Sequence, residues 1–534
     1  MGYVPPENYT ATRRTLHVLG MSALTAALTA SAALADDAAP TVPGPTAPAF
    51  TLTAAASTSA AYVSNASGLS NGSSDDFVLT LGFSAGVHDH TRRFIFDAQY
   101  AFTSDFYAKG TQPTHFTNNL QALGTVIAIP DYLTFTARAF ANPVVVSNAG
   151  IVTAGNRVVS NGYSNSYGYS VGPDLRFRLD DFLVSETSGV YGGTYFSRPA
   201  GSAPVVIIPG VPGPQDTTYR EASQVFTSGD DFERFNWTIT GVFSETDNKQ
   251  GLLSEKLGTF APRFSINHEF ALLGTVGYNA LTATIPLNRN VSGLVVLGGF
   301  QYVPSKDFSL VFEAGHNFGG GSYIGSLRYD LTPKSSIVGQ LNDYVTTPEG
   351  QLFDSLSSLT ATPGGDLTTP GNQLGNGSPG SLSTFSAQPI GNFGFDQNIS
   401  RYQIATLSYM EDLDRNHASL MLYASRRTIL SGVFLGPPIT DTWGGQLSFA
   451  RSFSPLSTGT VSARYSVDQE LGGIARTFTL DANVSYAMSR RMSAYFDANY
   501  IDRQSSASLA GVSPFSGSLS DYRIMVGISR TILP

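Results

Sequence analysis

Apolar and polar side chains alternate along most of the chain from Phe50 onward. In residues 325–341, GSLRYDLTPKSSIVGQL, every second residue from Leu327 to Leu331 is apolar. The sequence Thr-Pro-Lys-Ser then interrupts, and a second one-sided segment begins at Ile337. Because side chains i and i+2 of a strand share a face, each segment predicts a strand with one apolar and one polar face. The same pattern covers residues 93–102, 133–139, 237–244, 308–314, 461–467 and 493–500.

The connections between these segments fall into two classes that are expected to alternate strictly through most of the chain. Short, turn-rich connections are predicted at 88–91, 130–131, 180–181, 267–270, 304–307, 332–335 and 489–491. Longer polar or Gly-rich connections are predicted at 147–162, 197–217, 347–399, 430–440 and 503–520. Bacterial outer-membrane barrels show this asymmetry, with short turns on the periplasmic side and long loops outside.

The pattern therefore predicts an all-β fold, a single closed antiparallel transmembrane β-barrel of about 22 strands, within a range of about 18 to 24. In lipid each backbone N–H and C=O must be paired, so the sheet has to close on itself. We expect the last segment, Tyr522–Leu533, to pair with the first, near Leu52–Val63. The barrel would occupy residues 50–534, with a long flexible loop at about 347–399.

Two other all-β architectures fit an exported, strand-rich chain. A secreted β-solenoid requires a short fixed repeat, and the sequence contains none. A string of soluble sandwiches predicts connections of similar length at both ends of the strands. The two classes of connection favour the membrane barrel over both.

The composition agrees with strands that have one face in lipid and one in water. Asp, Glu, Lys and Arg make up 13% of the 534 residues, about half the usual soluble share, and aromatic residues make up 11%. The formal charge of −9 argues against nucleic acid as a partner. The absence of cysteine excludes disulfides and thiolate metal sites.

The N-terminus predicts export. Arg13 and Arg14 precede an apolar run over residues 16–34, and Ala33-Leu34-Ala35 provides a small-x-small cleavage site. This order predicts a signal peptide over residues 1–35, the alternative being a retained membrane anchor. Residues 36–49 form a Pro/Ala-rich periplasmic leader, and no later stretch approaches 18 continuous apolar residues. With the predicted barrel, these features place the mature chain in a bacterial outer membrane, with outer-membrane lipid as its first partner.

The central region resembles a known family, the outer-membrane β-barrel proteins associated with exosortase (PEP-CTERM) and exopolysaccharide loci. The resemblance lies in Val276-Gly277-Tyr278-Asn279 and in YVPSKDFSLVFEAGHNFGGGSYIGSLRYDLTPKSS, residues 302–336. Asn317 stands where the family pattern has arginine, which puts any role of that arginine in doubt. The resemblance implies an outer-membrane barrel connected with cell-surface polysaccharide and implies no reaction.

Several charged residues on the polar parity of the strands are expected to line the lumen. Rings of such side chains select the solutes that pass through a pore, while cross-strand ion pairs that fill the lumen explain them equally well. Tyrosines 163, 167, 169, 191 and 195 are interpreted as an interfacial girdle in preference to a sugar-stacking surface. The predicted lumen residues are Arg93, Asp97, Arg138, Arg328, Asp330, Arg464, Asp481 and Asp497.

The histidines do not predict catalysis, and we expect no enzyme, cofactor or metal site. His88 and His90 are placed in an exposed turn, where a metal would need a third ligand. His316 follows Glu313 by three residues, so the two point to opposite faces of a strand. A barrel enzyme would require a His with Ser or a carboxylate converging at the outer rim.

The sequence is compatible with two functions. The first is a pore or export conduit, with exopolysaccharide or small solutes as the candidate cargo. The second is a non-conducting structural or adhesion protein that presents surface loops. A leader of about 15 residues does not accommodate a folded N-terminal plug, which disfavours an energised uptake receptor, but the 347–399 segment could fold inward as a plug.

Overall fold

The structure, a computed structural model, describes only part of the chain. The predicted signal peptide and leader lie outside the described residues, as does most of the 347–399 segment. The described residues are 50–68, 74–145, 163–197, 216–248, 251–284, 289–346, 360–361, 367–368, 399–431, 438–470, 473–506 and 518–533.

These residues fold into β-strands, with no helix among them long and apolar enough to cross a membrane. The strands are β1 (Phe50–Val63), β2 (Asp76–His90), β3 (Phe94–Tyr107), β4 (His115–Ile129), β5 (Leu133–Val145), β6 (Tyr163–Leu179), β7 (Leu183–Ser197), β8 (Thr217–Ser228), β9 (Phe235–Asn248), β10 (Gly251–Ser265), β11 (Phe270–Ala283), β12 (Arg289–Ser305), β13 (Phe308–Asn317), β14 (Gly320–Thr332), β15 (Ser335–Thr346), β16 (Thr360–Ala361), β17 (Leu367–Thr368), β18 (Ile399–Leu413), β19 (Asn416–Ser431), β20 (Ile439–Ser454), β21 (Ser457–Glu470), β22 (Gly473–Ser489), β23 (Met492–Ser505) and β24 (Leu519–Leu533).

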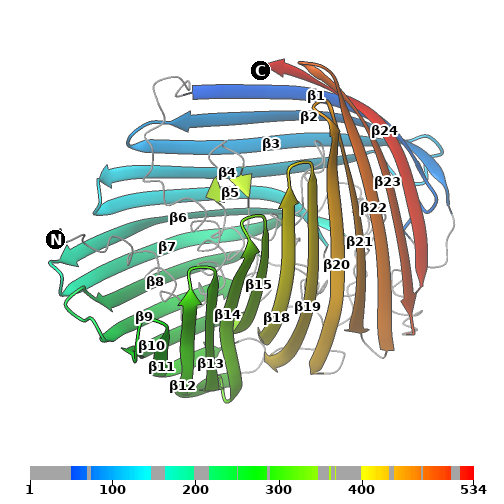
Figure 1. Cartoon of the computed structure of the whole chain (residues 1–534). Helices are drawn as coiled ribbons and strands as arrows, with labels where there is room; N and C mark the ends of the chain where they lie inside the picture. Colours follow the sequence, from blue (N-terminus) through cyan, green and yellow to red (C-terminus); the bar gives the residue numbers. More distant parts are fainter. Residues whose placement is uncertain are drawn as a thin grey trace.

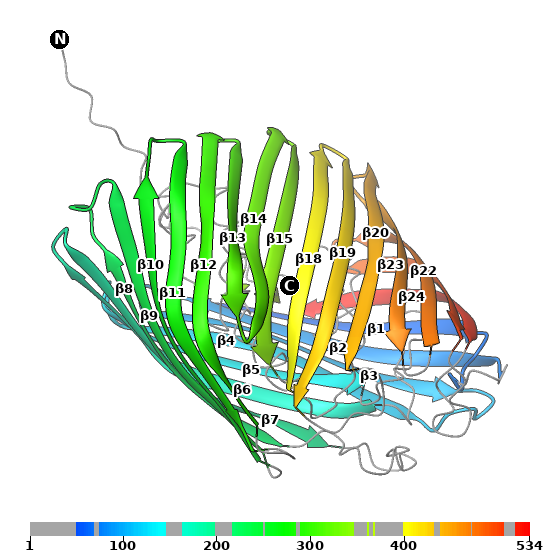
Figure 2. The same cartoon turned by 90° about the horizontal axis from the view of Figure 1, so that it is seen from below.

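Twenty-two of these strands form one antiparallel sheet that closes into a barrel (Figure 1). Each strand pairs with the next along the chain, β15 is followed in the ring by β18, and β24 pairs back with β1. Figure 2 shows β8 to β20 side by side along one part of the wall. The closed barrel and its strand number confirm the prediction, including the pairing of the last segment with the first.

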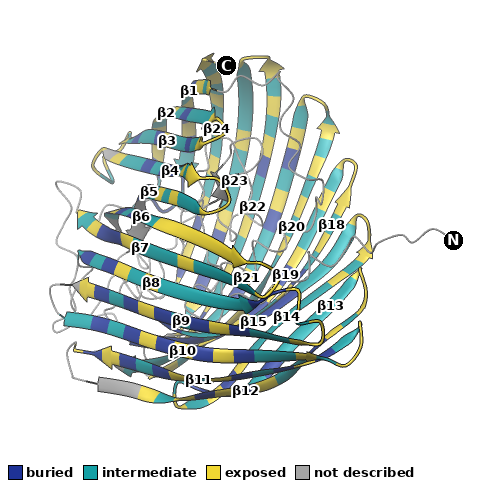
Figure 3. Cartoon of the chain, turned by 90° about the vertical axis from the view of Figure 1, so that its left-hand side faces the viewer, coloured by how far each residue is buried: buried dark blue, intermediate teal, exposed yellow. Residues whose placement is uncertain are grey.

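The outer face of the barrel is apolar. On β24 the side chains of Ile524, Val526 and Ile528 are exposed, while Asp521 on the other parity is buried. Figure 3 shows buried and exposed positions alternating in bands along many strands. Large apolar side chains are exposed on most of the barrel strands, which matches the hydrocarbon region of a membrane.

The two rims differ as expected, with corrections. The rim bearing the turns 130–132 and 180–182 is called the inner rim, and their Asp131 and Asp180 adopt positive φ values of 67° and 45°, which aspartate tolerates. The turn predicted at 88–91 is wrong, because β2 continues to His90 and the turn is 91–93. Strict alternation of short and long connections also fails, because the outer connections 249–250, 318–319 and 471–472 are turn-length.

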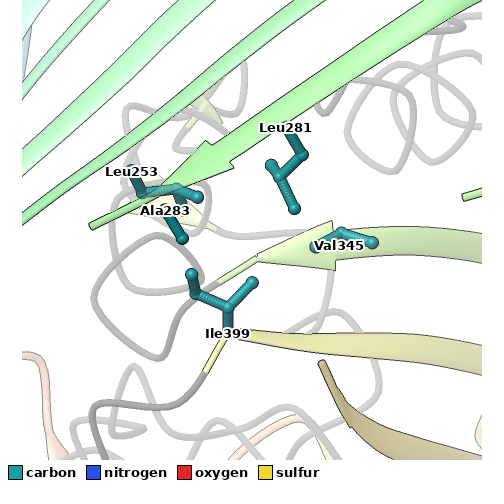
Figure 4. Packing of buried hydrophobic residues seen from close by; sticks show 5 residues of the cluster. All are labelled: Leu253, Leu281, Ala283, Val345 and Ile399. Carbon is teal, nitrogen blue, oxygen red and sulfur yellow. The ribbon is translucent and has the colours of Figure 1, made fainter. Parts of the chain in front are cut away.

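At the outer rim, the ends of β15 and β18 lean into the barrel. Val345 and Ile399, at these ends, pack against Leu253, Leu281 and Ala283 of β10 and β11 (Figure 4). Three strands, β12 to β14, separate the two groups around the ring, so the contact crosses the inside of those strands. The ladder between β14 and β15 correspondingly stops at the pair Gly325–Leu341.

The two-residue connection between β13 and β14 packs against this cluster. Phe318 and Gly319 have positive φ values of 50° and 75°, the conformation that a two-residue connection requires here. The Phe318 side chain packs against the Leu253–Ile399 cluster. Phenylalanine at positive φ is strained, and the packing of its ring offsets that strain.

The hairpin of β16 and β17 lies far from the strands that it connects. It belongs to the chain between β15 and β18, yet β17 lies beside β3 and β4 (Figure 1). Around the ring, β3 and β4 are almost diametrically opposite β15 and β18. The described hairpin between β15 and β18 therefore lies at the opposite wall.

The outer face gives a direct test of the membrane assignment. We expect Val526→Arg, in the middle of outward-facing β24, to lower the free energy of unfolding by about 2–4 kcal/mol, the cost of a cation at the bilayer midplane. Ser529→Arg, on the inward parity of the same strand, should cost less because the lumen is polar. Urea unfolding in lipid vesicles measures both, and equal losses would contradict the assigned faces.

Candidate functional site in the barrel lumen

The predicted lumen residues lie on the inward parity of their strands, with one correction. Asp97, for example, lies on β3 between the outward-facing Phe96 and Ala98 and is fully buried. Arg93 instead lies exposed in the turn 91–93, because β3 begins only at Phe94. Arg93 is therefore a rim residue. The residues on inward strand positions are Asp97, Arg138, Arg328, Asp330, Arg464, Asp481 and Asp497.

Three of the predicted residues lie together on β21 to β23. Asp481 Oδ1 accepts a hydrogen bond from Asn499 Nδ2 at 2.8 Å, and Asp497 Oδ1 accepts one from Asn483 Nδ2 at 2.6 Å. Arg464 lies on neighbouring β21, with its guanidinium carbon 5.7 Å from the Tyr423 ring centroid. This group carries two carboxylates on two adjacent strands, and each accepts a hydrogen bond from an asparagine side chain.

The other predicted residues are dispersed around the ring. Arg328 Nε donates to Asp330 Oδ2 at 3.0 Å on the same strand, β14. Arg138 is largely enclosed on β5, and its Nε has no hydrogen-bond partner among the described residues. The lumen charges therefore form separate local groups instead of one ring at a single depth.

Asp97 joins two histidines that sequence reasoning had placed in a solvated turn. His88 Nδ1 and His90 Nε2 each lie 2.9 Å from Asp97 Oδ1, on the inward parity of β2. The local sequence His-Asp-His continues the period-two alternation of β2. The turn-forming residues that follow it led to the wrong prediction of a turn at 88–91. Within the described ranges, no group of three or more His, Asp or Glu side chains is arranged to hold a metal ion.

A buried ion pair that the sequence did not reveal secures the inward-leaning ends of β15 and β18. Arg401 Nε donates to Asp343 Oδ1 at 2.7 Å, and Nη2 also contacts the same carboxylate. The Arg401 side chain donates further to the Gly321 carbonyl oxygen at 2.8 Å and lies 5.9 Å from the Phe318 ring centroid. The guanidinium thus bridges β18, β15 and the tip of the β13–β14 hairpin where the backbone ladder is interrupted.

Buried glutamates form a further group that sequence reasoning missed. Glu255 on β10 and Glu313 on β13 are 3% and 7% exposed, on the inward parity of apolar-flanked strands. Thr275 donates to Glu313 Oε1 at 3.1 Å, and Asn279 donates to Glu255 Oε1 at 3.2 Å. A single acidic residue on the polar parity of a strand was the only available signal, and it does not reveal burial.

The described tyrosines of the predicted girdle lie on the outward parity of β6 and β7. Tyr167, Tyr191 and Tyr195 are exposed on the outer face of β6 and β7, toward the outer rim. Tyr169 stacks on Tyr195 with ring centroids 6.2 Å apart. The side chain of Tyr163 lies outside the described part of the structure. Aromatic rings at this height suit the membrane–water interface.

Ion pairs at the rims shift the pKa of exposed groups. In the outer connections, Lys109 Nζ lies 2.6 Å from Asp75 Oδ2, and this contact lowers the pKa of Asp75. In the inner turns, Lys334 and Asp414 form an ion pair that raises the pKa of the lysine and lowers that of the aspartate. These pairs join neighbouring hairpins at the surface.

Histidine–carboxylate contacts among the described residues lie toward the inner rim. Besides His88 and His90, His417 contacts Asp412 at 2.8 Å across an inner turn, where both are exposed. A catalytic group of the kind that outer-membrane hydrolases use would lie at the outer rim instead. The described histidine–carboxylate contacts therefore do not lie where such a catalytic group would be expected.

Comparison with known proteins adds nothing to the assignment of fold or function. No family model and no curated protein matches the chain. Among solved structures, the siderophore receptor PiuA from Acinetobacter baumannii is similar with a TM-score of 0.48 and 8% identity, over 90% of this chain and 81% of that one. The FpvAI-pyocin S2 complex gives a TM-score of 0.47 and 11% identity, over 90% and 70%. At this level of likeness the assignment depends on the strand pairing itself.

The closed ring, its apolar outer face and its polar interior define the class of protein. A sheet of 22 antiparallel strands closed into a ring has no free edge, so its backbone groups pair between neighbouring strands, as lipid requires. The aromatic residues near the outer rim and the short inner turns give it the orientation of bacterial barrels. The protein is an outer-membrane β-barrel.

Proposed function

We propose that the protein is a conduit for polar solutes across the outer membrane, constricted from within by the insertion between β15 and β18. The observation that carries this proposal is the position of the β16–β17 hairpin beside β3 and β4, across the ring from its own flanking strands. A closed ring of this size encloses a lumen that is either water-filled or plugged.

The polar lining supports conduction. Inward positions on β21 to β24 carry carboxylates, amides and guanidinium groups, including Asp481, Asp497 and Arg464. Such groups replace part of the hydration shell of a passing solute and select for charge.

We propose exopolysaccharide as the candidate cargo, on the resemblance of residues 276–279 and 302–336 to barrels from exopolysaccharide loci. Residues 302–336 form the hairpins from β12 to the start of β15, which adjoin the inward-leaning ends. A polysaccharide is an extended neutral or acidic chain, which needs a wide polar lumen. The same lumen would also accept small polar solutes.

A second function is favoured by the same hairpin. If the insertion fills the lumen, the barrel would be a non-conducting structural protein that presents its outer connections. The packing of Val345 and Ile399 against β10 and β11 narrows the outer half of the lumen and supports this alternative.

Conductance of the purified full-length protein in planar bilayers separates the two functions. Stepwise open-channel currents in KCl are expected for the conduit. Complete electrical silence of protein that is folded by circular dichroism would favour the structural role. Passage of labelled oligosaccharides into proteoliposomes then tests the cargo, and exclusion of oligosaccharides from a conducting barrel would restrict it to small solutes.

The acidic group on β22 and β23 should set the charge preference of the conduit. We expect the double variant Asp481→Asn, Asp497→Asn to reduce the preference for cations, because two inward carboxylates are removed while Arg464 stays. The reversal potential in a KCl gradient measures this change. Asp441→Asn, at an exposed ion pair with Arg426, is the matched control and should leave the potential unchanged. Identical potentials in all three proteins would contradict a role for this group.

A further inference from the structure

The inner rim carries four arginines along one arc of the barrel, from β20 to β24. Arg451 and Arg530 lie near the inner ends of β20 and β24, and Arg490 and Arg491 form the turn between β22 and β23. All four residues are exposed, and none forms an ion pair with a carboxylate of the described residues. We call these four residues the arginine row.

Strand pairing brings the members of the row together. Arg530 pairs with Met492, the first residue of β23, and the Thr531 N–H donates to the Arg491 carbonyl oxygen at 2.8 Å. Arg451 lies four strands away, and the strands from β20 to β24 pair in succession. Neighbouring strands are about 4.8 Å apart, so the row extends over roughly 20 Å. Figure 1 shows these strands side by side on one part of the wall.

Elsewhere on the inner rim, cations meet carboxylates. Arg178 Nη2, for example, lies 3.0 Å from Asp181 Oδ1 and 2.5 Å from Asp230 Oδ2. The two inner turns within the arc contain no acidic residue, because 455–456 is Pro-Leu and 490–491 is Arg-Arg. The arginine row therefore presents positive charge that the described part of the protein does not neutralise.

Exposed apolar side chains lie directly beside the row. Arg451 lies between Phe449 and Phe453 on the outward face of β20, and these two side chains are 43% and 56% exposed. Arg530 lies between two exposed isoleucines on the outward face of β24. Arginines at the edge of an apolar band keep their stems on the apolar surface and direct their charge to the headgroup region. This setting favours a lipid over a soluble protein as the partner.

We propose that the arginine row binds the phosphate groups of anionic phospholipids in the periplasmic leaflet of the outer membrane. A guanidinium group pairs with phosphate oxygens through two parallel N–H···O hydrogen bonds. Clusters of about four to eight basic residues at a membrane surface attract anionic headgroups. The acyl chains of the bound lipids would lie along the exposed apolar side chains of β20 to β24. The site does not depend on whether the barrel conducts.

Spin-labelled lipids test the proposal on the full-length protein. The protein is reconstituted in phosphatidylcholine vesicles that contain a trace of spin-labelled phosphatidylglycerol or spin-labelled phosphatidylcholine. Electron paramagnetic resonance then measures the fraction of each label that the protein surface immobilises. We expect phosphatidylglycerol to associate several-fold more strongly than phosphatidylcholine. The combined variant Arg451→Gln, Arg490→Gln, Arg491→Gln, Arg530→Gln should lose most of this preference, because each basic residue near the headgroups contributes to the attraction.

A variant with the same change in net charge is the matched control. The substitutions Arg178→Gln, Arg220→Gln, Lys334→Gln and Arg426→Gln remove four cations that already pair with carboxylates. This variant should keep the preference for phosphatidylglycerol, and heat-modifiable gel mobility confirms that both variants are folded. Equal loss in the two variants, or an unchanged preference without the row, would overturn the proposal. Equal immobilisation of both labels by the intact protein, the result expected if an acidic periplasmic protein binds the row, would overturn it too.

Discussion

Removing the insertion between β15 and β18 should raise the single-channel conductance several-fold. Thr346 and Ser400 are paired neighbours at the ends of β15 and β18, so a short Gly-Ser linker in place of residues 348–398 closes a normal hairpin. The variant loses the β16–β17 hairpin beside β3 and β4 and retains all 22 barrel strands. Because ion flow is limited by the narrowest part of the lumen, loss of an obstruction there has a large effect. Planar-bilayer recording in KCl measures the change.

A shortened connection between β23 and β24 is the matched control. Residues 508–516 lie in an outer connection between adjacent strands, so their replacement by the same linker tests the effect of loop removal alone. This control should conduct as the full-length protein does. If the variant without residues 348–398 has the conductance of the intact protein, the insertion does not constrict the lumen. If the intact protein is silent and the variant conducts, the insertion acts as a complete plug.

The sequence was sufficient for the barrel because period-two alternation is a local property. Segments such as Phe94–Phe102 and Phe308–Ala314 carry their apolar parity regardless of where they lie in the ring, and the structure places that parity outward. The turns at Pro130-Asp131 and Asp180-Asp181 could also be predicted from local sequence, because aspartate tolerates a positive φ. The predicted turn at His88 and His90 was wrong for the complementary reason. The turn-forming residues that follow them were given more weight than the alternation, which continues to His90.

For the candidate site, the sequence predicts only which face of its strand each residue occupies. Asp97, Asp481 and Asp497 could be placed on the inward face, but their partners are set by the register between strands, which local sequence does not determine. The cluster that contains Val345 and Leu253 joins residues from strands on either side of β12 to β14. It exists because β15 and β18 lean inward, and no single segment encodes that lean. Burial of Glu255 depends on the same long-range geometry.

Loss of the Arg401 side chain should be among the most destabilising single changes in the barrel. Arg401 and Asp343 form an ion pair whose side chains are 10% and 1% exposed, and Arg401 also donates to the Gly321 carbonyl oxygen. Arg401→Ala leaves Asp343 buried without its cation and frees the carbonyl at a gap in the ladder. We expect the free energy of unfolding to fall by about 3–5 kcal/mol. Urea unfolding in lipid vesicles, followed by tryptophan fluorescence, provides the measurement.

Two further variants separate the causes of this loss. Arg426→Ala removes one partner of the ion pair with Asp441, whose side chains are 55% and 46% exposed, and it should cost about 1 kcal/mol or less. The double variant Arg401→Met, Asp343→Leu removes both buried charges and should recover much of the lost stability, because no unpaired charge remains. If Arg401→Ala costs no more than Arg426→Ala, the pair does not hold β15 and β18 inward. If the double variant remains as unstable as Arg401→Ala, the bond to Gly321 is the dominant contribution.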